Sequence, residues 1–157
     1  MIVIGYQGIG KSTLVGKNHK YIDLESSNFW VDGKREIDWY KPYCQIAEHL
    51  SQQGYIVFTS SHEVVRRRLR NSSESIVVVV PSRELKDEWI KKLQVRYDQS
   101  GLEKDYKALM NAKERYEDNV NEMYLDGFFH FSVLEIKSID YDLEQMLEEE
   151  MSDERED

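Results

Sequence analysis

The sequence predicts an α/β fold in which a five-stranded parallel sheet lies between two layers of helices, a three-layer α/β/α sandwich. Two observations lead to this prediction. First, five short apolar runs alternate with segments of helical periodicity, at residues 1–4, 20–25, 55–58, 76–80 and 128–136. Second, residues 76–80 read Ile-Val-Val-Val-Val without alternation. Such a run is typical of a strand buried on both faces, as in a parallel sheet.

The first apolar run leads directly into a glycine-rich loop. Residues 5–12 read Gly-Tyr-Gln-Gly-Ile-Gly-Lys-Ser, which fits the G-x-x-x-x-G-K-[ST] spacing of the phosphate-binding P-loop. A loop of this composition wraps a phosphate chain with backbone N–H groups, beside the start of the following helix. The motif therefore predicts a nucleoside triphosphate as the ligand. The residues expected to contact it are Gly5, Gln7, Gly8, Ile9, Gly10, Lys11, Ser12 and Thr13.

Four side chains in and after this loop are candidates for chemistry. Lys11 is expected to reach the β- and γ-phosphates, and the Ser12 hydroxyl is expected to bind Mg²⁺. Asp23 and Glu25 end the second apolar run, at the edge where open parallel sheets bind ligands. Their spacing places both carboxylates on one face of a strand. Asp23 then suits Mg²⁺ and its bound water, and Glu25 suits an acceptor hydroxyl; capping a helix near Ser26 is the alternative role for both.

Residues 28–36 combine aromatic and cationic side chains. Trp30 can stack on a flat ring and Arg35 can hold an anionic group, while a hydrophobic staple for the next helix is the alternative role of this segment. That helix is expected to start at an N-cap, Asp38, and to stop at Gly54. Tyr40, near its start, is a candidate to face a pocket.

Hydroxyl side chains follow the third apolar run. A Walker B motif would place an aspartate here, and its absence disfavours a mechanical ATPase. Ser60 instead suits hydrogen bonding to a substrate, and His62 is interpreted as the cap of the next helix. Four arginines then fall within residues 63–70, so some of them must be solvated. We expect one of Arg66, Arg67 and Arg70 to contact an acceptor, because a guanidinium group matches a phosphate well.

Residues 91–126 are predicted to form a hairpin of helices that closes over the phosphates as a lid. Arg96 or Lys104 is expected to reach into the site, and Gly127 is expected to be the C-cap of the second helix. Residues 137–139, after the last strand, are expected to lie beside the adenine. Residues 148–157 are strongly acidic and are expected to form a disordered tail.

Length and composition predict one domain, at residues 1–147, because 157 residues with 40% hydrophobic side chains can build one core. A net charge of −9 disfavours a nucleic-acid partner, which requires an excess of basic residues. No apolar run is long enough to cross a membrane. The chain has a single cysteine, Cys44, and its glycine loop leaves no room for a signal peptide, so a cytoplasmic location is expected.

With these motifs in place, the chain resembles the small P-loop kinases, which are the nucleoside monophosphate kinases and the related shikimate and gluconate kinases. The Asp23-x-Glu25 pair looks like the D-x-D of shikimate-type kinases, with Glu25 a departure from the second aspartate. Ser60 and the arginines after it look like the serine-then-basic stretch of gluconate kinase, and Arg96 is similar in placement to a lid arginine. The short first helix and the tyrosine-rich long helix look like small bacteriophage kinases that supply deoxynucleotides.

The resemblance implies the P-loop NTP hydrolase/kinase fold and transfer of the γ-phosphoryl group of ATP to a small acceptor, a nucleoside or deoxynucleoside monophosphate. The residues expected in catalysis are Lys11, Asp23, Arg66 and Arg96, with Mg²⁺ held by Ser12 and Asp23. The residues expected to bind the acceptor are Glu25, Trp30, Arg35, Tyr40, Ser60, Arg67 and Arg70. Two alternatives stay open: a gluconate- or shikimate-type kinase, and a nucleotide-binding switch or ATPase that acts through a protein partner.

Overall fold

A computed structural model describes residues 1–156 and confirms the α/β class with a five-stranded parallel sheet. The strand order is β2-β5-β1-β6-β7, and every neighbouring pair is parallel. The strands are β1 (Ile2–Gly5), β2 (Tyr21–Asp23), β5 (Ile56–Thr59), β6 (Ile76–Pro81) and β7 (Ser132–Ile136). Because β1 is the central strand, the loop that follows it lies at the middle of the carboxyl edge of the sheet.

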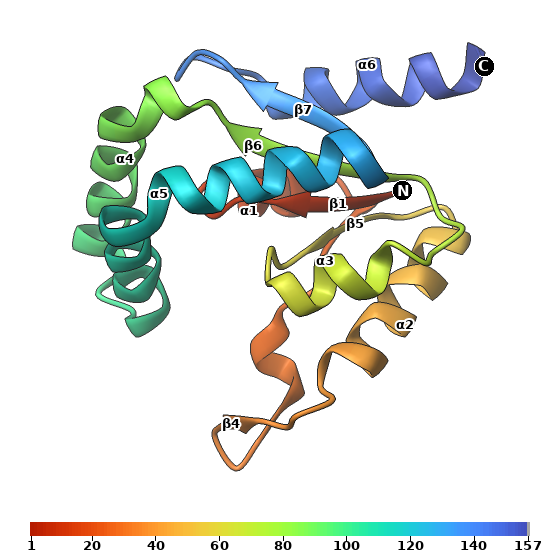
Figure 1. Ribbon diagram of the computed structural model, residues 1–157, viewed down its shortest axis with the longest axis horizontal. Helices are drawn as coiled ribbons and strands as arrows, with labels where there is room; N and C mark the ends of the chain where they lie inside the picture. Colours follow the sequence, from red (N-terminus) through yellow and green to blue (C-terminus); the bar gives the residue numbers. More distant parts are fainter. Residues whose placement is uncertain (157) are drawn as a thin grey trace.

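Six helices lie in the described part of the chain. They are α1 (Lys11–Lys17), α2 (Tyr40–Gln52), α3 (Glu63–Leu69), α4 (Lys86–Ser100), α5 (Glu103–His130) and α6 (Leu143–Glu156), with single 3-10 turns at η1 (Ser26–Phe29) and η2 (Arg83–Leu85). In Figure 1, α5 passes in front of the sheet and α1 lies behind it. Helices therefore cover both faces, an arrangement compatible with the predicted three-layer sandwich.

The core is centred on the three inner strands. Every residue of β5 and β6 is buried, and so are Ile2, Val3 and Ile4 of β1. Successive side chains of a strand point to opposite faces, so burial along a whole strand requires cover on both sides of the sheet. The unbroken valine run in β6 was a correct indication of this two-sided burial.

The last strand begins later than predicted. Helix α5 continues to His130, so Gly127 is not its C-cap, and Phe128 and Phe129 belong to the helix, where they remain exposed. Gly127 is buried against the sheet, and a Cβ atom at this position would lie 2.8 Å from the Cβ atom of Val133 and 3.2 Å from that of Val78. A glycine is needed here because it lets α5 approach the sheet closely, not because it ends the helix.

Residues 30–35 form a hairpin that projects from the body of the protein (Figure 1). Its strands are β3 (Trp30–Val31) and β4 (Lys34–Arg35), which pair antiparallel. Asp32 and Gly33 connect them with φ angles of 52° and 76°, as a two-residue type I′ turn requires. At the nearby start of α2, the Asp38 side chain does not cap the helix and pairs with Lys41 instead.

The described part of the chain ends in a helix, so residues 148–156 do not form the disordered tail that was predicted from residue 148 onward. Leu143, Leu147 and Met151 recur every four residues of α6, and the first two are buried while the third is half-buried against the core. This narrow apolar stripe holds an otherwise acidic segment on the protein. Asp157 lies outside the described residues. Nowhere in residues 1–156 is a helix long and apolar enough to cross a membrane.

Candidate functional site

The Gly5–Ser12 loop has a backbone conformation that only glycine adopts readily. Gly8 and Gly10 have φ angles of 85° and 98°. Gly8 is also tightly packed, because a Cβ atom there would lie 2.9 Å from Cδ2 of Leu93 and 3.3 Å from Nε1 of Trp89. The glycine at this position therefore allows both the turn of the loop and the close approach of α4.

Hydrogen bonds to three later segments fix the outer side of this loop. The indole Nε1 of Trp89, in α4, donates to the carbonyl oxygen of Gln7 at 2.9 Å. The hydroxyl of Tyr141, before α6, donates to the carbonyl oxygen of Ile9 at 2.6 Å. The side-chain amide of Gln7, within the loop, donates to the carbonyl oxygen of Ala108 in α5 at 3.0 Å. The loop is therefore held by hydrogen bonds to α4, to α5 and to the segment before α6.

The backbone N–H groups of the loop remain available as donors. Within residues 1–156, no acceptor is found for the backbone N–H groups of Gln7, Gly8, Gly10, Lys11 and Ser12. Successive N–H groups in a turn that includes positive φ angles form an anion-binding concavity. The loop thus has the donor arrangement that a phosphate chain requires.

Lys11 and Asp23 meet beside the loop. The Lys11 ammonium group lies 3.2 Å from the Asp23 carboxylate, and both side chains are mostly buried. Residues 1–156 contain no group of three or more His, Cys, Asp and Glu side chains that could hold a metal ion. Mg²⁺ does not need one, because it keeps several waters and takes phosphate oxygens as ligands. Ser12 and Asp23 supply oxygen ligands of the hard type that Mg²⁺ prefers, so they fit the predicted role.

Four cavities surround the loop. Cavity A, of about 300 Å³, lies between the loop and α4 and is lined by Lys11, Ser12, Lys92 and Arg96 among others. Cavity B, of about 400 Å³, lies between α1 and the segment before α6, with Ile139 and Tyr141 in its wall. Cavity C, of about 450 Å³, includes Glu25, Trp30, Arg35, His62 and Lys104. Cavity D, of about 320 Å³, includes Tyr6, Arg66, Asn111, Arg115 and Asn119.

Arg96 is one of the two candidate lid cations. It lines cavity A beside the loop, and its Nε atom lies 3.1 Å from the buried carboxylate of Asp105. Lys104 lies instead at cavity C, where its ammonium group is 3.9 Å from the Glu25 carboxylate. The two helices after β6 thus bring cations to two different cavities. Ile139 lies at cavity B, where residues 137–139 are expected to meet a base.

Arg35 of cavity C lies over two indole rings. Its guanidinium carbon is 5.5 Å from the ring centre of Trp30 and 5.1 Å from that of Trp39, and the guanidinium group donates to the Ser26 hydroxyl at 3.1 Å. Desolvation by these neighbours lowers the pKa of Arg35, although an arginine stays charged at neutral pH. Trp30 is 41% exposed, so its ring remains accessible to a ligand.

His62 connects cavities C and D, which also share Gln7 and Asn111. The His62 ring contacts the edge of Trp39 at a centroid distance of 5.3 Å, and its Nδ1 atom lies 2.8 Å from the Ser60 hydroxyl. Desolvation, followed by the positive charges of Arg35 and Arg66, lowers the pKa of His62 to about 4. The imidazole is therefore neutral at physiological pH.

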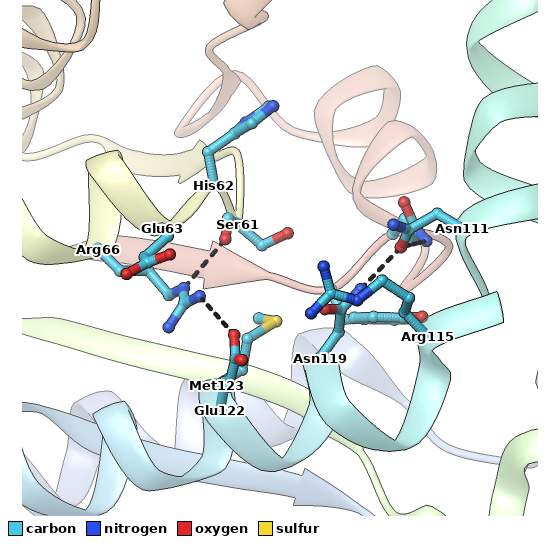
Figure 2. Close-up of a pocket in the computed structure, with 11 residues that line it drawn as sticks. Ser61, His62, Glu63, Arg66, Asn111, Arg115, Asn119, Glu122 and Met123 are labelled. Atoms are coloured by element: carbon cyan, nitrogen blue, oxygen red, sulfur yellow. Dashed lines mark hydrogen bonds and ion pairs between the residues drawn. The ribbon is translucent and has the colours of Figure 1, made fainter.

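Cavity D places two arginines on different helices, as Figure 2 shows. Arg66, in α3, is buried; it donates to the carbonyl oxygen of Ser61 at 3.0 Å and pairs with the buried Asp126. Arg115 lies at a kink in α5, with φ −136° and ψ 22°. The amide of Asn119 donates to the Asn111 side chain at 2.9 Å across this kink. The kink thus carries a cation at the wall of the cavity.

Several predicted residues lie away from these cavities. Arg67 is exposed and pairs with Glu63, while Arg70 pairs with Asp126, and neither lines one of the four cavities. Tyr40 packs half-buried against the core and lines none of them either. Ser60 contacts His62 but is not a lining residue itself.

Sequence reasoning missed a polar row on α5 and one lysine on α4. Asn111, Arg115 and Asn119 recur every four residues, which places them on one helix face toward the loop. This spacing of polar residues could have been recognised in the sequence as one polar face of a helix. Lys92 lines both cavities A and B, and its position follows only from the packing of α4 on the loop.

A comparison with known protein-family models finds no match for this chain, and a comparison with curated proteins finds no similar sequence. The function is therefore inferred from the geometry of the site.

Proposed function

We propose that the protein is a phosphotransferase of the P-loop kinase fold that moves the γ-phosphoryl group of ATP to a small acceptor, a nucleoside or deoxynucleoside monophosphate. One observation carries the proposal: cavities A and B, and cavities C and D, meet at the two sides of one loop that offers free N–H donors. A donor nucleotide and an acceptor can thus bind on the two sides at the same time.

The donor side suits ATP. The free N–H groups and Lys11 suit the phosphate chain, and cavity B offers apolar side chains such as Ile9 and Ile139 for a base. Ser12 and Asp23 would hold Mg²⁺, which would neutralise part of the phosphate charge. Because Lys11 pairs with Asp23 here, binding of a phosphate chain gives the lysine a second anionic partner.

The acceptor side suits a flat ring joined to an anion. Trp30 presents an accessible aromatic face in cavity C, while Arg35 and, across the shared residues His62 and Asn111, Arg115 supply positive charge. Arg66 is less available for an acceptor, since Asp126 already pairs with it. A nucleoside monophosphate has both a ring and a phosphate, whereas a sugar acid has no flat ring to stack on Trp30.

Catalysis in this proposal is mostly positioning and charge neutralisation, because phosphoryl transfer asks little covalent chemistry of the protein. Lys11, Arg96 and Arg115 bring three cations toward the loop from α1, α4 and α5.

The test is a coupled assay for ADP release with each ribo- and deoxynucleoside monophosphate, gluconate and shikimate as acceptors. Turnover that depends on a nucleoside monophosphate supports the proposal, and turnover with gluconate or shikimate points to a metabolite kinase. Hydrolysis that needs no acceptor points to a switch or ATPase, which the absence of an aspartate at the end of β5 does not favour. Lys11→Ala should abolish activity, while Lys91→Ala, at an exposed position of α4, should leave it unchanged.

A further inference from the structure

Lys92 occupies an unusual place on α4. It lines cavity A together with Lys11 and Ser12, and cavity B together with Tyr141, so it lies at the junction of the two cavities on the donor side of the loop. Most other lysines of the chain lie at the surface, but Lys92 is half-buried. Its position is therefore determined by contacts inside the site.

Two aromatic rings hold the Lys92 ammonium group. Its nitrogen lies 4.4 Å from the ring centre of Trp89 and 4.7 Å from that of Tyr141, and these rings stack with an interplanar angle of 21°. The ammonium group also donates to the Tyr141 hydroxyl at 2.6 Å. Since the same hydroxyl donates to the carbonyl oxygen of Ile9, Lys92 is connected to the loop through one side chain.

Among residues 1–156, no carboxylate pairs with the ammonium group of Lys92. The charged and titratable groups that share its cavities are Lys11, Lys17, Arg96, Tyr141, Asp142 and Glu144. Glu144 pairs with Lys17 at 3.5 Å, and Asp142 accepts the backbone N–H of Gln145 at the start of α6. Burial raises the pKa of Tyr141 to about 12, so that hydroxyl stays neutral. Desolvation, followed by the positive charge of Arg96, lowers the pKa of Lys92 to about 8.

We infer that Lys92 is a second phosphate-binding lysine of the donor site, fixed by Trp89 and Tyr141 at the junction of cavities A and B so that its ammonium group contacts the phosphate chain of the nucleotide. This inference rests on the proposed binding of ATP to the Gly5–Ser12 loop. It assigns a role to a cation that has aromatic contacts and, in the described part of the chain, no carboxylate partner; a phosphate supplies the missing negative charge.

A consequence is that nucleotide binding takes up protons. In the free protein near pH 8 a part of the Lys92 side chains is neutral, and the negative charge of a bound phosphate chain raises the pKa of Lys92 toward its usual value. Binding of ATP at pH 8 therefore takes up a fraction of a proton per site. A lysine that only supported the fold would not change its protonation when the nucleotide binds.

The experiment is titration calorimetry of the full chain with Mg-ATP at pH 8, in two buffers of different ionisation enthalpy. Lys92→Met should weaken ATP binding roughly 10- to 100-fold, the value of one charge-assisted hydrogen bond, and abolish proton uptake. Lys92→Arg should keep most of the affinity and lose the uptake, because arginine does not deprotonate. Lys91→Met removes the same charge from an exposed position of α4 and should change neither quantity.

Three results with the Lys92 variants overturn the inference. Unchanged ATP affinity in Lys92→Met would show that Lys92 does not contact the phosphate chain. Unchanged proton uptake in Lys92→Arg would show that another group takes up the proton. The dissociation constant of magnesium tripolyphosphate should rise in Lys92→Met by about the same factor as that of ATP; an unchanged affinity for tripolyphosphate places Lys92 against the base or ribose. Should Lys92→Met fail to fold, Lys92→Arg decides. Absence of ATP binding to the wild type overturns the proposed function as well, whereas ATP binding without phosphotransfer overturns only the kinase activity.

Discussion

The ammonium group of Lys11 lies 3.2 Å from the carboxylate of Asp23, and this ion pair joins the start of α1 to the end of β2. Both residues are proposed to act on the same phosphate chain, Lys11 directly and Asp23 through Mg²⁺. The pair therefore keeps each side chain near its proposed position before any ligand binds.

Asp23→Asn should separate nucleotide binding from catalysis. Removal of the carboxylate charge frees Lys11 for the phosphates, so ATP affinity should stay the same or rise a few-fold. Turnover should fall by about 10²- to 10⁴-fold, because the Mg²⁺ site and a candidate base are lost. Equilibrium binding and the ADP-release assay measure the two effects. Asp38→Asn, at an exposed residue paired with Lys41, is the control; equal losses of affinity and turnover in Asp23→Asn would contradict the assignment.

Gly8→Ala should damage the loop itself. The new methyl group would lie 2.9 Å from Leu93 on a backbone with φ 85°, so we expect a loss of about 1–3 kcal/mol in the free energy of unfolding and a loss of ATP binding. Gly16→Ala is the matched control, because nothing lies within 4 Å of a Cβ atom at that position in α1. It should stabilise the protein by about 0.5–1 kcal/mol. Denaturant unfolding measures both effects, a decrease in the free energy of unfolding for Gly8→Ala and an increase for Gly16→Ala.

Trp30→Ala and Arg115→Met should impair use of the acceptor and spare ATP binding. The first removes the aromatic face of cavity C and the second removes the cation at the α5 kink. Each should raise the acceptor KM by roughly 10-fold or more, the effect of one stacking contact or one charged hydrogen bond. Arg67→Met removes an exposed arginine that lines none of the four cavities and should have no effect. A change in ATP affinity as large as the change in acceptor KM would contradict the proposal that ATP and the acceptor bind on separate sides of the loop.

Asp126→Asn should be strongly destabilising. Asp126 is buried and pairs with both Arg66 and Arg70, so its loss leaves the buried Arg66 guanidinium without its main counter-charge. The expected loss is about 3–5 kcal/mol. Glu122→Gln, at a half-exposed carboxylate 3.6 Å from Arg66, should cost less than about 1 kcal/mol. Urea unfolding of the wild type, Asp126→Asn and Glu122→Gln measures these losses in the free energy of unfolding. Equal, small losses in the two variants would contradict the buried role of Asp126.

His62 should make stability fall as the pH falls from about 6.5 to about 4. In this window the unfolded chain protonates this histidine, while the folded protein, whose His62 pKa is lowered to about 4, does not. The unfolded state then binds more protons, so folding becomes less favourable. Because the residue is exposed, water screens the effect and the loss should stay below about 1 kcal/mol. His62→Asn, compared with the wild type at pH 7 and pH 5, should remove this part of the pH dependence.

The sheet and the loop were predictable because local patterns determine them. The valine run predicts the buried strand β6, and the glycine spacing of residues 5–12 predicts the loop, each from consecutive residues alone. The hairpin at Asp32 and Gly33 was equally local, and its turn chemistry was overlooked. Residues 128–131 misled because a run of aromatic side chains reads as a strand, although α5 ends with two of them exposed.

The candidate site was predictable only where motifs reach it. Lys11 and Asp23 follow from the loop and the strand order, whereas Lys92 and Arg115 depend on how α4 and α5 pack and bend. Four arginines in one short helix suggested an anion site, but Arg66 and Arg70 serve an ion-pair network around Asp126, a residue distant in the sequence. Which cations face a ligand and which face a carboxylate is decided by tertiary contacts.

The bonds that Trp89 and Tyr141 donate to the Gly5–Ser12 loop set an order of events during protein synthesis. The ribosome makes the loop first, but the partner of the Ile9 carbonyl emerges 132 residues later. A nascent chain whose Tyr141 has not yet left the ribosome lacks one of the hydrogen bonds that shape the loop. Capture of a nucleotide should therefore follow synthesis of Tyr141, and translation products that end before Tyr141 should not compete for ATP.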